Sequence, residues 1–373
     1  MKINELFFRN HATKWELEKT TFGDLTLLVG VSGVGKTQIL KSIQNLVDIS
    51  EGKALNGVEW DLRFTTKDGG RYQWKGIFEV TKDAAQEPKI LNETLSLEDK
   101  LIFTRAENTV KYEEKDVPKV TPHLSVLSLF TSEDKIIPVK EGFNQITLVD
   151  YSIEQKLYVP VKDSLAFVKA FEEDSSKASV EGGKIAKSKL IGAIKKNPFY
   201  LMFKLFVISE LFNDKFVEIV DEFKNLFPQI EDVRFVQENV KEYELKLKEK
   251  GTGWIPQREI SSGMFKTLMH IVELKLTADG FVVLIDEFEN SLGVNCIDTV
   301  ADNLTVPGRD IQYIVTSHHP YIINNIAMKY WKVVTRKGSK VSTINAEQLG
   351  LGKSKHEAFK QLLNLEAFAE GIS

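Results

Sequence analysis

The segment from Gly30 to Thr37, which reads GVSGVGKT, constrains the fold more than any other part of this sequence. It joins an apolar run, Leu25–Val29, to a run with helical spacing, Gln38–Val47. In this strand–loop–helix setting, a glycine-rich loop surrounds phosphate oxygens with backbone N–H groups at the positive end of a helix dipole. The pattern therefore predicts a site for a nucleoside triphosphate and disfavours a chance glycine-rich turn.

Two side chains of the loop have predicted chemical tasks. Lys36 is expected to reach the β and γ phosphates, and the Thr37 hydroxyl is expected to hold Mg²⁺. We therefore expect ATP and Mg²⁺ as cofactors. The loop residues expected to contact the nucleotide are Gly30, Ser32, Gly33, Val34, Gly35, Lys36, Thr37 and Gln38.

The composition limits what kind of protein this is. A chain of 373 residues, 42% of them hydrophobic, suits one large or two modest domains with a sizeable core. The net charge of −4 gives no support to nucleic-acid binding by bulk charge, although a local basic patch is compatible with it. Cys296 is the only cysteine in the sequence, which excludes an internal disulfide bond and a thiolate metal cluster.

The apolar segment Pro198–Phe212 is the one membrane candidate in the sequence. It is too short to span a bilayer and carries Lys204 and Glu210, so a buried or partner-facing helix is the better interpretation. The start, Met1–Leu6, has no apolar signal region. We expect a soluble, cytoplasmic protein without a membrane partner.

The first part of the chain, residues 1–150, has the pattern of a mainly β lobe that carries the phosphate loop. Its predicted strands are Ile3–Arg9, Leu25–Val29, Val58–Thr65, Arg71–Val80 and Lys100–Thr104, and its one clear helix is Thr37–Val47. Short β-rich runs separated by turn residues are typical of such a lobe.

Residues 151–252 are expected to form a helical insert or lid. Apolar spacing predicts a helix from Phe212 that Pro228 ends. The stretch Val233–Lys248 is either an extended strand or a short helix. The lysines between Ser175 and Lys196 favour a solvated helix face over a nucleic-acid contact.

Residues 253–335 alternate between helical and strand patterns. The predicted helices are Gly263–Leu276, Val294–Leu304 and Tyr321–Ala327, and the predicted strands are Phe281–Ile285 and Ile311–Thr316. This alternation is typical of a parallel sheet covered by helices, so we predict an α/β fold whose second ATPase lobe is formed here. Residues 336–373 are expected to add a strand and helix extension, with a terminal helix near Lys355–Glu370.

The apolar strand Phe281–Ile285 ends in two carboxylates, Asp286 and Glu287. A buried parallel strand delivers its last residues to the ligand edge of the sheet. Asp286 is expected to hold the Mg²⁺ that Thr37 also contacts, and Glu287 to act as the general base on water. The phosphate loop favours this over the alternative of two acids in a surface turn.

A second core strand, Ile311–Thr316, is followed by Ser317, His318, His319 and Pro320. A histidine at this position can donate a hydrogen bond to the γ-phosphate and keep the carboxylate that activates water in line. His318 is therefore the second predicted catalytic residue, beside Glu287.

The segment Ile260–Met264, which reads ISSGM, comes directly before a predicted helix. Serine and glycine at this position are first of all a helix N-cap. The same exposed N–H groups and hydroxyl also make a phosphate site, which adds Ser261 and Gly263 to the expected nucleotide contacts. Because the chain already has one phosphate loop, these two residues point to the γ-phosphate held by a neighbouring subunit.

The order of these motifs resembles the ABC-type, AAA-family ATPases of the SMC, RecF and OLD-like branch. The resemblance implies a P-loop NTPase head with an inserted helical lobe and a homodimer that closes head to head around two ATP molecules. It also implies that Asn290–Gly293 crosses between the two sites. The chain departs from the family where Gly293-Val294 replaces the usual His-Pro, and Gln145 is only a provisional match to the glutamine loop.

The sequence argues against several kinds of ABC-type ATPase. The interval from Lys36 to Ser261 is longer than transporter heads allow, which argues against a transport subunit. No heptad arm is present, which excludes the long coiled-coil proteins. OLD-type proteins carry a metal-dependent nuclease domain after the ATPase. The residues after His318 contain no aspartate, so the clustered carboxylates that a two-metal nuclease needs are not expected here.

The remaining candidates resemble the ATPase components of bacterial anti-phage defence systems of the PARIS or Septu type. This resemblance implies a slow ATPase that acts as a sensor or scaffold and controls a separate effector, a nuclease or a toxin. The alternative is a RecF- or SMC-like DNA-maintenance ATPase that binds duplex DNA. An ATP-gated assembly protein outside both pathways is the third interpretation.

Overall fold

The structure is a computed structural model that describes residues 1–83, 85–106, 109–149, 155–156, 158–162, 165–166, 168–169, 201–289, 296, 304, 308–319, 323 and 325–350. The chain divides into two compact units. Unit 1 comprises Met1–Val149, Gly280–Phe288 and Gly308–Ser373, and unit 2 comprises Asp150–Asp279 and Glu289–Pro307. The division into four segments, 1–150, 151–252, 253–335 and 336–373, remains a prediction from the sequence.

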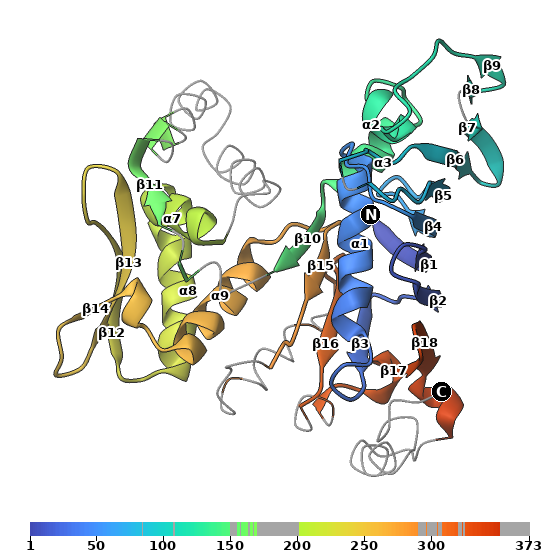
Figure 1. The fold of residues 1–373 in the computed structure, drawn as a ribbon. Helices are drawn as coiled ribbons and strands as arrows, with labels where there is room; N and C mark the ends of the chain where they lie inside the picture. Colours follow the sequence, from blue (N-terminus) through green and yellow to red (C-terminus); the bar gives the residue numbers. More distant parts are fainter. Residues whose placement is uncertain are drawn as a thin grey trace. The chain divides into compact units, whose positions relative to one another are not determined.

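Unit 1 is built on a 14-stranded sheet with the order β10-β15-β16-β3-β17-β18-β2-β1-β4-β5-β6-β7-β8-β9 (Figure 1). The strands of its first part are β1 (Lys2–Asn10), β2 (Trp15–Thr21), β3 (Leu25–Val29), β4 (Val58–Thr65), β5 (Arg71–Phe78), β6 (Ile90–Leu97), β7 (Lys100–Ala106), β8 (Thr109–Tyr112) and β9 (Lys115–Asp116). The later strands are β10 (Ile146–Val149), β15 (Val282–Ile285), β16 (Gln312–Ser317), β17 (Trp331–Lys337) and β18 (Lys340–Asn345).

The sheet has a parallel part and a mainly antiparallel part. Strands β10, β15, β16, β3 and β17 pair in parallel. Strands β3, β15 and β16 are buried along their whole length, as expected where both faces of a sheet are covered. Strands β4 and β5 instead alternate between buried and more exposed residues, which is the pattern of a sheet with one solvated face.

Helix α1 (Lys36–Ser50) follows the phosphate loop and covers the sheet (Figure 1). Its apolar side chains Ile39, Ile43 and Leu46 belong to the same buried cluster as Trp60 and Trp74 of the antiparallel strands. The short helices α2 (Val126–Leu129) and α3 (Ile137–Phe143) and the 3₁₀ turns η3 (Met328–Tyr330) and η4 (Ala346–Leu349) complete the described part of this unit. One core therefore spans the strand that carries the phosphate loop and the antiparallel lobe.

Unit 2 combines helices with a small sheet. Strands β12 (Ile230–Gln237) and β13 (Glu242–Glu249) pair as an antiparallel hairpin, which β11 (Val159–Pro160) and β14 (Trp254–Pro256) extend. The helices are α7 (Leu201–Leu211), α8 (Asn213–Leu226) and α9 (Ser262–Leu276), and the 3₁₀ turn η2 (Gln257–Glu259) precedes α9. The predicted strand or short helix over Val233–Lys248 is thus a hairpin of two strands.

The apolar segment near residue 200 is a core helix. Residues Leu201–Ile208 of α7 are buried, and the Phe206 ring lies 5.2 Å from Phe235 and 4.7 Å from Tyr243 between ring centroids. The expected buried helix is confirmed, as is the helix that ends before Pro228. Across the residues that the structure describes, no helix combines the length and apolarity needed to cross a bilayer.

Most predicted strands of unit 1 are confirmed, with small shifts at their ends, and the predicted α/β P-loop NTPase fold is confirmed. Two of the strands that were not predicted from the sequence are β2 and β6. Their charged and polar residues hide the strand pattern, because few of their side chains, such as Leu17 and Leu95, are buried. The expected helices Val294–Leu304, Tyr321–Ala327 and Lys355–Glu370 lie wholly or largely outside the described residues.

Candidate nucleotide site

A polar pocket of about 230 Å³ lies at the carboxyl ends of β3, β15 and β16, within unit 1. Its lining residues are Ser32, Gly33, Gly35, Lys36, Thr37, Gln38, Asp286, Glu287, Thr316, His318 and Arg336. The three strands are parallel neighbours, so their last residues meet at one edge of the sheet. The pocket therefore unites segments that lie far apart in the sequence.

The phosphate loop has the backbone that its glycines predict. Gly33 and Gly35 adopt φ angles of 85° and 111°, in the left-handed region that favours glycine. A Cβ atom on Gly35 would lie 2.9 Å from Val341 of β18, and one on Gly30 would lie 2.8 Å from the carbonyl oxygen of Val334. The loop is therefore packed directly against the β17–β18 hairpin.

Lys36 is the first residue of α1, and its side chain folds back across the loop. Its Nζ donates to Gly30 O at 2.7 Å and to Val31 O at 3.0 Å. The ammonium is thus held over the loop, where phosphate oxygens would be surrounded by the loop's amides. Gly30 and Val34 belong to the loop without lining the pocket, and Val34 is buried in the core.

Thr37 and Asp286 are direct neighbours. Thr37 Oγ1 donates to Asp286 Oδ1 at 3.1 Å, although 249 residues separate them in the sequence. A hydroxyl and a carboxylate are hard oxygen ligands of the kind that Mg²⁺ takes, together with phosphate oxygens and water. No group of three or more His, Cys, Asp or Glu side chains suited to a metal occurs among the described residues. The pair therefore fits a Mg²⁺ ion that the nucleotide helps to hold.

Thr316 organises the turn that carries the two carboxylates. Its buried hydroxyl donates to Asp286 Oδ1 at 2.6 Å and accepts from Glu287 N at 2.8 Å, while its carbonyl oxygen accepts from Phe288 N at 3.0 Å. Glu287 has a φ angle of 46°, a conformation that is uncommon for a residue other than glycine. Hydrogen bonds from β16 thus hold Glu287 in the turn, with its side chain at the pocket.

The two histidines after β16 are placed differently. His318 is exposed and lines the pocket. His319 does not line it, and its backbone N–H donates to Ser317 Oγ at 3.1 Å. The structure therefore brings His318, and not His319, together with Lys36 and the carboxylates.

Ser261 and Gly263 lie in unit 2, at the start of α9. Ser261 is the N-cap of this helix, and its Oγ accepts from Met264 N at 3.3 Å. Ser261 is exposed, and Gly263 is half-buried. The N-cap is confirmed, whereas the contact of both residues with a nucleotide remains a prediction. Asn290–Gly293 lies outside the described residues.

The provisional match of Gln145 to the glutamine loop is wrong. Its carbonyl oxygen accepts from Val282 N, and it precedes β10, so it lies at the amino ends of the parallel strands, away from the pocket. Gln155, which follows β10 by several residues, carried no prediction from the sequence. Gln155 Nε2 donates to the carbonyl oxygen of Ile260 at 2.7 Å, directly before Ser261.

Two lining residues carried no sequence signal strong enough to select them. Thr316 stands in the quoted motif before His318, yet its hydroxyl position depends on the neighbouring strand. Arg336 lies in β17, far from every recognised motif. Its Nη1 donates to Gly33 O at 3.3 Å, which brings a second cation to the phosphate loop.

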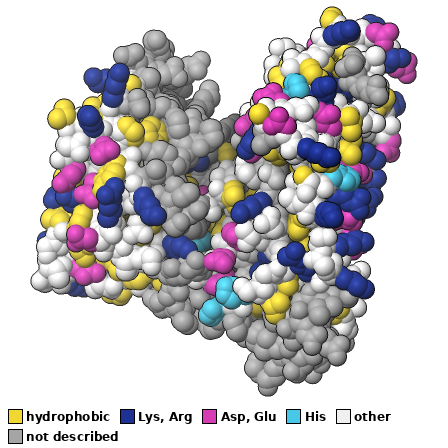
Figure 2. Space-filling model, in the orientation of Figure 1, with side chains coloured by type: hydrophobic (Ala, Val, Ile, Leu, Met, Phe, Trp, Pro, Cys, Tyr) yellow, Lys and Arg dark blue, Asp and Glu magenta, His cyan; other side chains and the backbone are white. Residues whose placement is uncertain are grey.

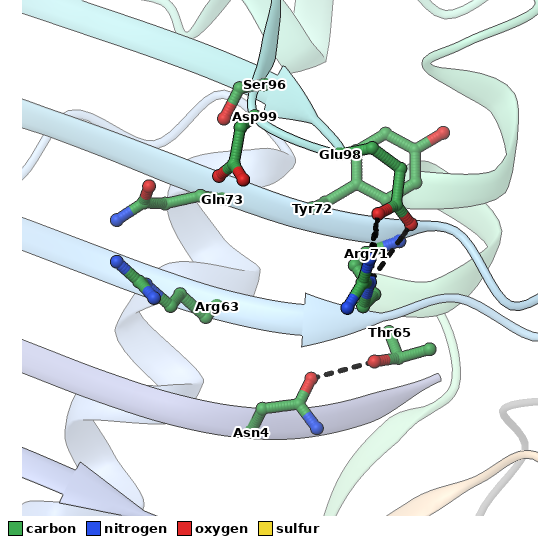
Figure 3. Close-up of a pocket in the computed structure, with 9 residues that line it drawn as sticks. All are labelled: Asn4, Arg63, Thr65, Arg71, Tyr72, Gln73, Ser96, Glu98 and Asp99. Carbon is green, nitrogen blue, oxygen red and sulfur yellow. Dashed lines mark hydrogen bonds and ion pairs between the residues drawn. The ribbon is translucent and has the colours of Figure 1, made fainter.

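A second hollow, of about 290 Å³, lies on the outer face of the antiparallel strands. Figure 3 shows Arg71 paired with Glu98, and Asn4 joined to Thr65. Arg63 and Asp99 add one further charge of each sign, so the lining has no net charge that would attract a phosphate. Figure 2 likewise shows Lys and Arg interspersed with Asp and Glu on the face in view.

The sequence matches the family described as "AAA domain, putative AbiEii toxin, Type IV TA system" over residues 25–324. The chain belongs to this family. The matched range includes the phosphate loop, both carboxylates and His318. Membership of an AAA-domain family agrees with the strand–loop–helix and the parallel sheet described above.

The chain is also similar to two curated proteins. Over 138 residues it is 27% identical to a phosphonates import ATP-binding protein PhnC of Mycoplasma capricolum and to one of Mycoplasma mycoides. In each case the match covers 35% of this chain and 47% of the relative. The chain thus spans about half the length of the curated relatives it matches.

The fold is also similar to that of a solved structure, the SmcHead bound to the C-winged helix domain of ScpA. The TM-score is 0.50 at 15% identity, and the match covers 94% of this chain and 99% of the solved chain. At this identity the similarity concerns the fold alone. It agrees with a P-loop NTPase head of the ABC and SMC type.

Proposed function

We propose that this protein binds ATP with Mg²⁺ in the pocket at the phosphate loop and hydrolyses it slowly. The observation that carries the proposal is the convergence of Lys36, Thr37, Asp286, Glu287 and His318 on one pocket. Each of these residues has a task in phosphoryl transfer to water, and three separate parts of the chain supply them.

Thr37 and Asp286 are the residues that would hold the metal. When bound, Mg²⁺ neutralises charge on the β and γ phosphates. Lys36 adds a positive charge beside the loop amides, which bind and orient the triphosphate. The half-buried Asp286 keeps its hydrogen bond from Thr316, so its position is set before any ligand arrives.

Glu287 is the proposed general base. It accepts a proton from the attacking water as the water oxygen forms a bond to the γ-phosphorus. The bond between that phosphorus and the β–γ bridging oxygen breaks, and ADP and phosphate leave. His318 donates a hydrogen bond to the transferred phosphate and so stabilises the charge that develops there.

The proposed active form is a homodimer, or a higher oligomer, closed around ATP. Every residue that lines the pocket belongs to unit 1, whereas the exposed N-cap of α9 belongs to unit 2. Ser261 and Gly263 of a second copy would donate hydrogen bonds to the γ-phosphate from a helix N-terminus. ATP would then join two copies, each of which supplies the groups that the other site needs.

The proposed biological role is that of a cytoplasmic sensor or scaffold in anti-phage defence, which controls a separate effector of nuclease or toxin type. The family's description names a toxin of a type IV toxin–antitoxin system, which supports a role in a system of several components. The alternative is a RecF- or SMC-like ATPase that binds duplex DNA, and the same experiments separate the two.

Equilibrium binding of ATP and steady-state hydrolysis test the proposal directly. The wild-type protein should bind ATP in the presence of Mg²⁺, and Lys36→Ala should lose binding while it keeps its fold by circular dichroism. Near-normal affinity in Lys36→Ala would overturn the assignment of the loop. Binding to duplex DNA that needs ATP and weakens with salt would favour the DNA-maintenance alternative over the defence role.

A further inference from the structure

Arg336 brings a positive charge to the phosphate loop from outside all the recognised motifs. It lies near the end of β17 and lines the pocket. Its Nη1 donates to Gly33 O at 3.3 Å, and its Nε donates to Gly338 O at 2.7 Å. Within the described part of the chain, no carboxylate forms an ion pair with it, and its other N–H groups have no hydrogen-bond partner there.

The strand that carries Arg336 is packed directly against the phosphate loop. β17 pairs in parallel with β3, and Val333 is opposite Val29. Arg336 follows Val333 by three residues on the same strand. The space for a Cβ atom on Gly30 is already filled by the Val334 carbonyl oxygen, at 2.8 Å. The sheet therefore positions the backbone of Arg336, and the carbonyl oxygens of Gly33 and Gly338 hold its guanidinium.

Arg336 and the hydrolytic groups approach the loop from opposite sides. β16 and β15, which carry His318 and the two carboxylates, lie on one side of β3, whereas β17 lies on the other. In the proposed function, the bond to be broken would lie beside the carboxylates. Arg336, on the other side of β3, would then lie beside the part of the nucleotide that ATP and ADP share.

We propose that Arg336 is a nucleotide-binding residue that donates hydrogen bonds to the α- or β-phosphate of the bound nucleotide. This inference rests on the proposed function, since it needs a nucleotide in the pocket. A guanidinium presents several N–H groups in one plane and can bind phosphate oxygens in pairs while it still holds the Gly33 carbonyl. Arg336 would thus bind ATP and ADP alike and contribute little to the chemical step.

The test compares Arg336→Gln and Arg336→Lys with the matched control Lys337→Gln. Lys337 is the next residue of the same strand, is exposed, and does not line the pocket. Because neighbouring strand residues point to opposite faces, the control removes the same charge from the other side of β17. The dissociation constants of ATP and ADP are measured by calorimetry, together with kcat and KM.

Arg336→Gln should raise both dissociation constants about tenfold and by similar factors, with kcat within about twofold of the wild type. Arg336→Lys should recover part of the affinity, and Lys337→Gln should match the wild type. Unchanged dissociation constants, or a loss of kcat at unchanged affinity, would overturn the inference. Wild-type protein that fails to bind ATP would overturn the proposed function itself, which distinguishes the two failures.

Discussion

The Thr316 hydroxyl donates a 2.6 Å hydrogen bond to Asp286 Oδ1. The same oxygen accepts the Glu287 N–H at 2.8 Å, so one side chain of β16 holds both the proposed metal ligand and the backbone of the proposed base. Asp286 in turn accepts a hydrogen bond from Thr37 of the phosphate loop at 3.1 Å. A chain of polar contacts thus connects β16, β15 and α1 at the centre of the pocket.

Thr316→Val should lower kcat about tenfold or more, while ATP binding through the phosphate loop is largely kept. Valine has the shape of threonine and lacks the hydroxyl, so Asp286 and the Glu287 turn lose the hydrogen bonds that hold them. Thr316→Ser should retain most of the activity. Steady-state kinetics with ATP measures both effects.

Thr335→Val is the matched control for this substitution. Thr335 is a buried threonine on β17, which lies two strands from β16 in the sheet, and its Oγ1 has no hydrogen-bond partner among the residues described. Its replacement should leave the thermal midpoint unchanged or slightly raised. Equal effects of Thr316→Val and Thr335→Val on kcat would refute the role given to Thr316.

Glu287→Gln should keep ATP bound and accumulate the closed dimer. Glutamine preserves the size of the side chain but cannot accept the proton from water, while the phosphate and Mg²⁺ contacts survive. Light scattering with ATP should show a doubled mass for the variant and a smaller shift for the wild type. A variant that binds ATP and stays monomeric would contradict the composite site.

Ser261→Arg should abolish hydrolysis, and mixing it with Lys36→Ala should restore part of it. In a mixed dimer, one site combines an intact Lys36 with an intact Ser261, and the other site has neither. Random pairing therefore predicts about a quarter of the wild-type rate. No recovery, or full recovery, would speak against sites shared between two copies.

The same substitution removes the N-cap of α9, because Ser261 Oγ accepts the Met264 N–H. The loss should lower the stability of the protein by about 1 kcal/mol. Ser261→Ala should lower the stability by the same amount, but it lacks the bulk of arginine. It therefore separates the loss of the N-cap from steric obstruction of the partner's nucleotide site. Thermal unfolding of both variants gives the comparison.

His270 makes stability depend on pH. Burial, and to a lesser degree the charge of Lys266, lowers the pKa of His270 to about 3 from an ordinary value of 6.5. The unfolded chain takes up this proton below pH 6.5 and the folded chain does not, so stability falls as the pH drops from about 6.5 towards 3.

In the wild type, this proton uptake lowers the free energy of unfolding between neutral pH and pH 4. His270→Gln should reduce that loss by a few kcal/mol. Urea unfolding at several pH values measures it. His11→Gln, at a half-buried histidine of unit 1, controls for the removal of one imidazole. An unchanged pH dependence in His270→Gln would contradict the assignment.

The local motifs were recognisable in the sequence because each is a short pattern with one physical meaning. The glycines and Lys36 of the phosphate loop, the carboxylates after an apolar strand, and the serine that caps α9 can all be read without knowledge of the fold. The buried strands of the parallel sheet were predictable for the same reason, since continuous apolar runs need cover on both faces.

The relationships across the sheet were decided only by the tertiary structure. Gln145 seemed a plausible contact in the sequence, yet strand direction places it at the opposite edge. Thr316 and Arg336 carry no pattern of their own, and their positions follow from which strands lie beside β3. Sequence spacing encodes local conformation, whereas strand order and register, which are set by long-range packing, determine which side chains share a pocket.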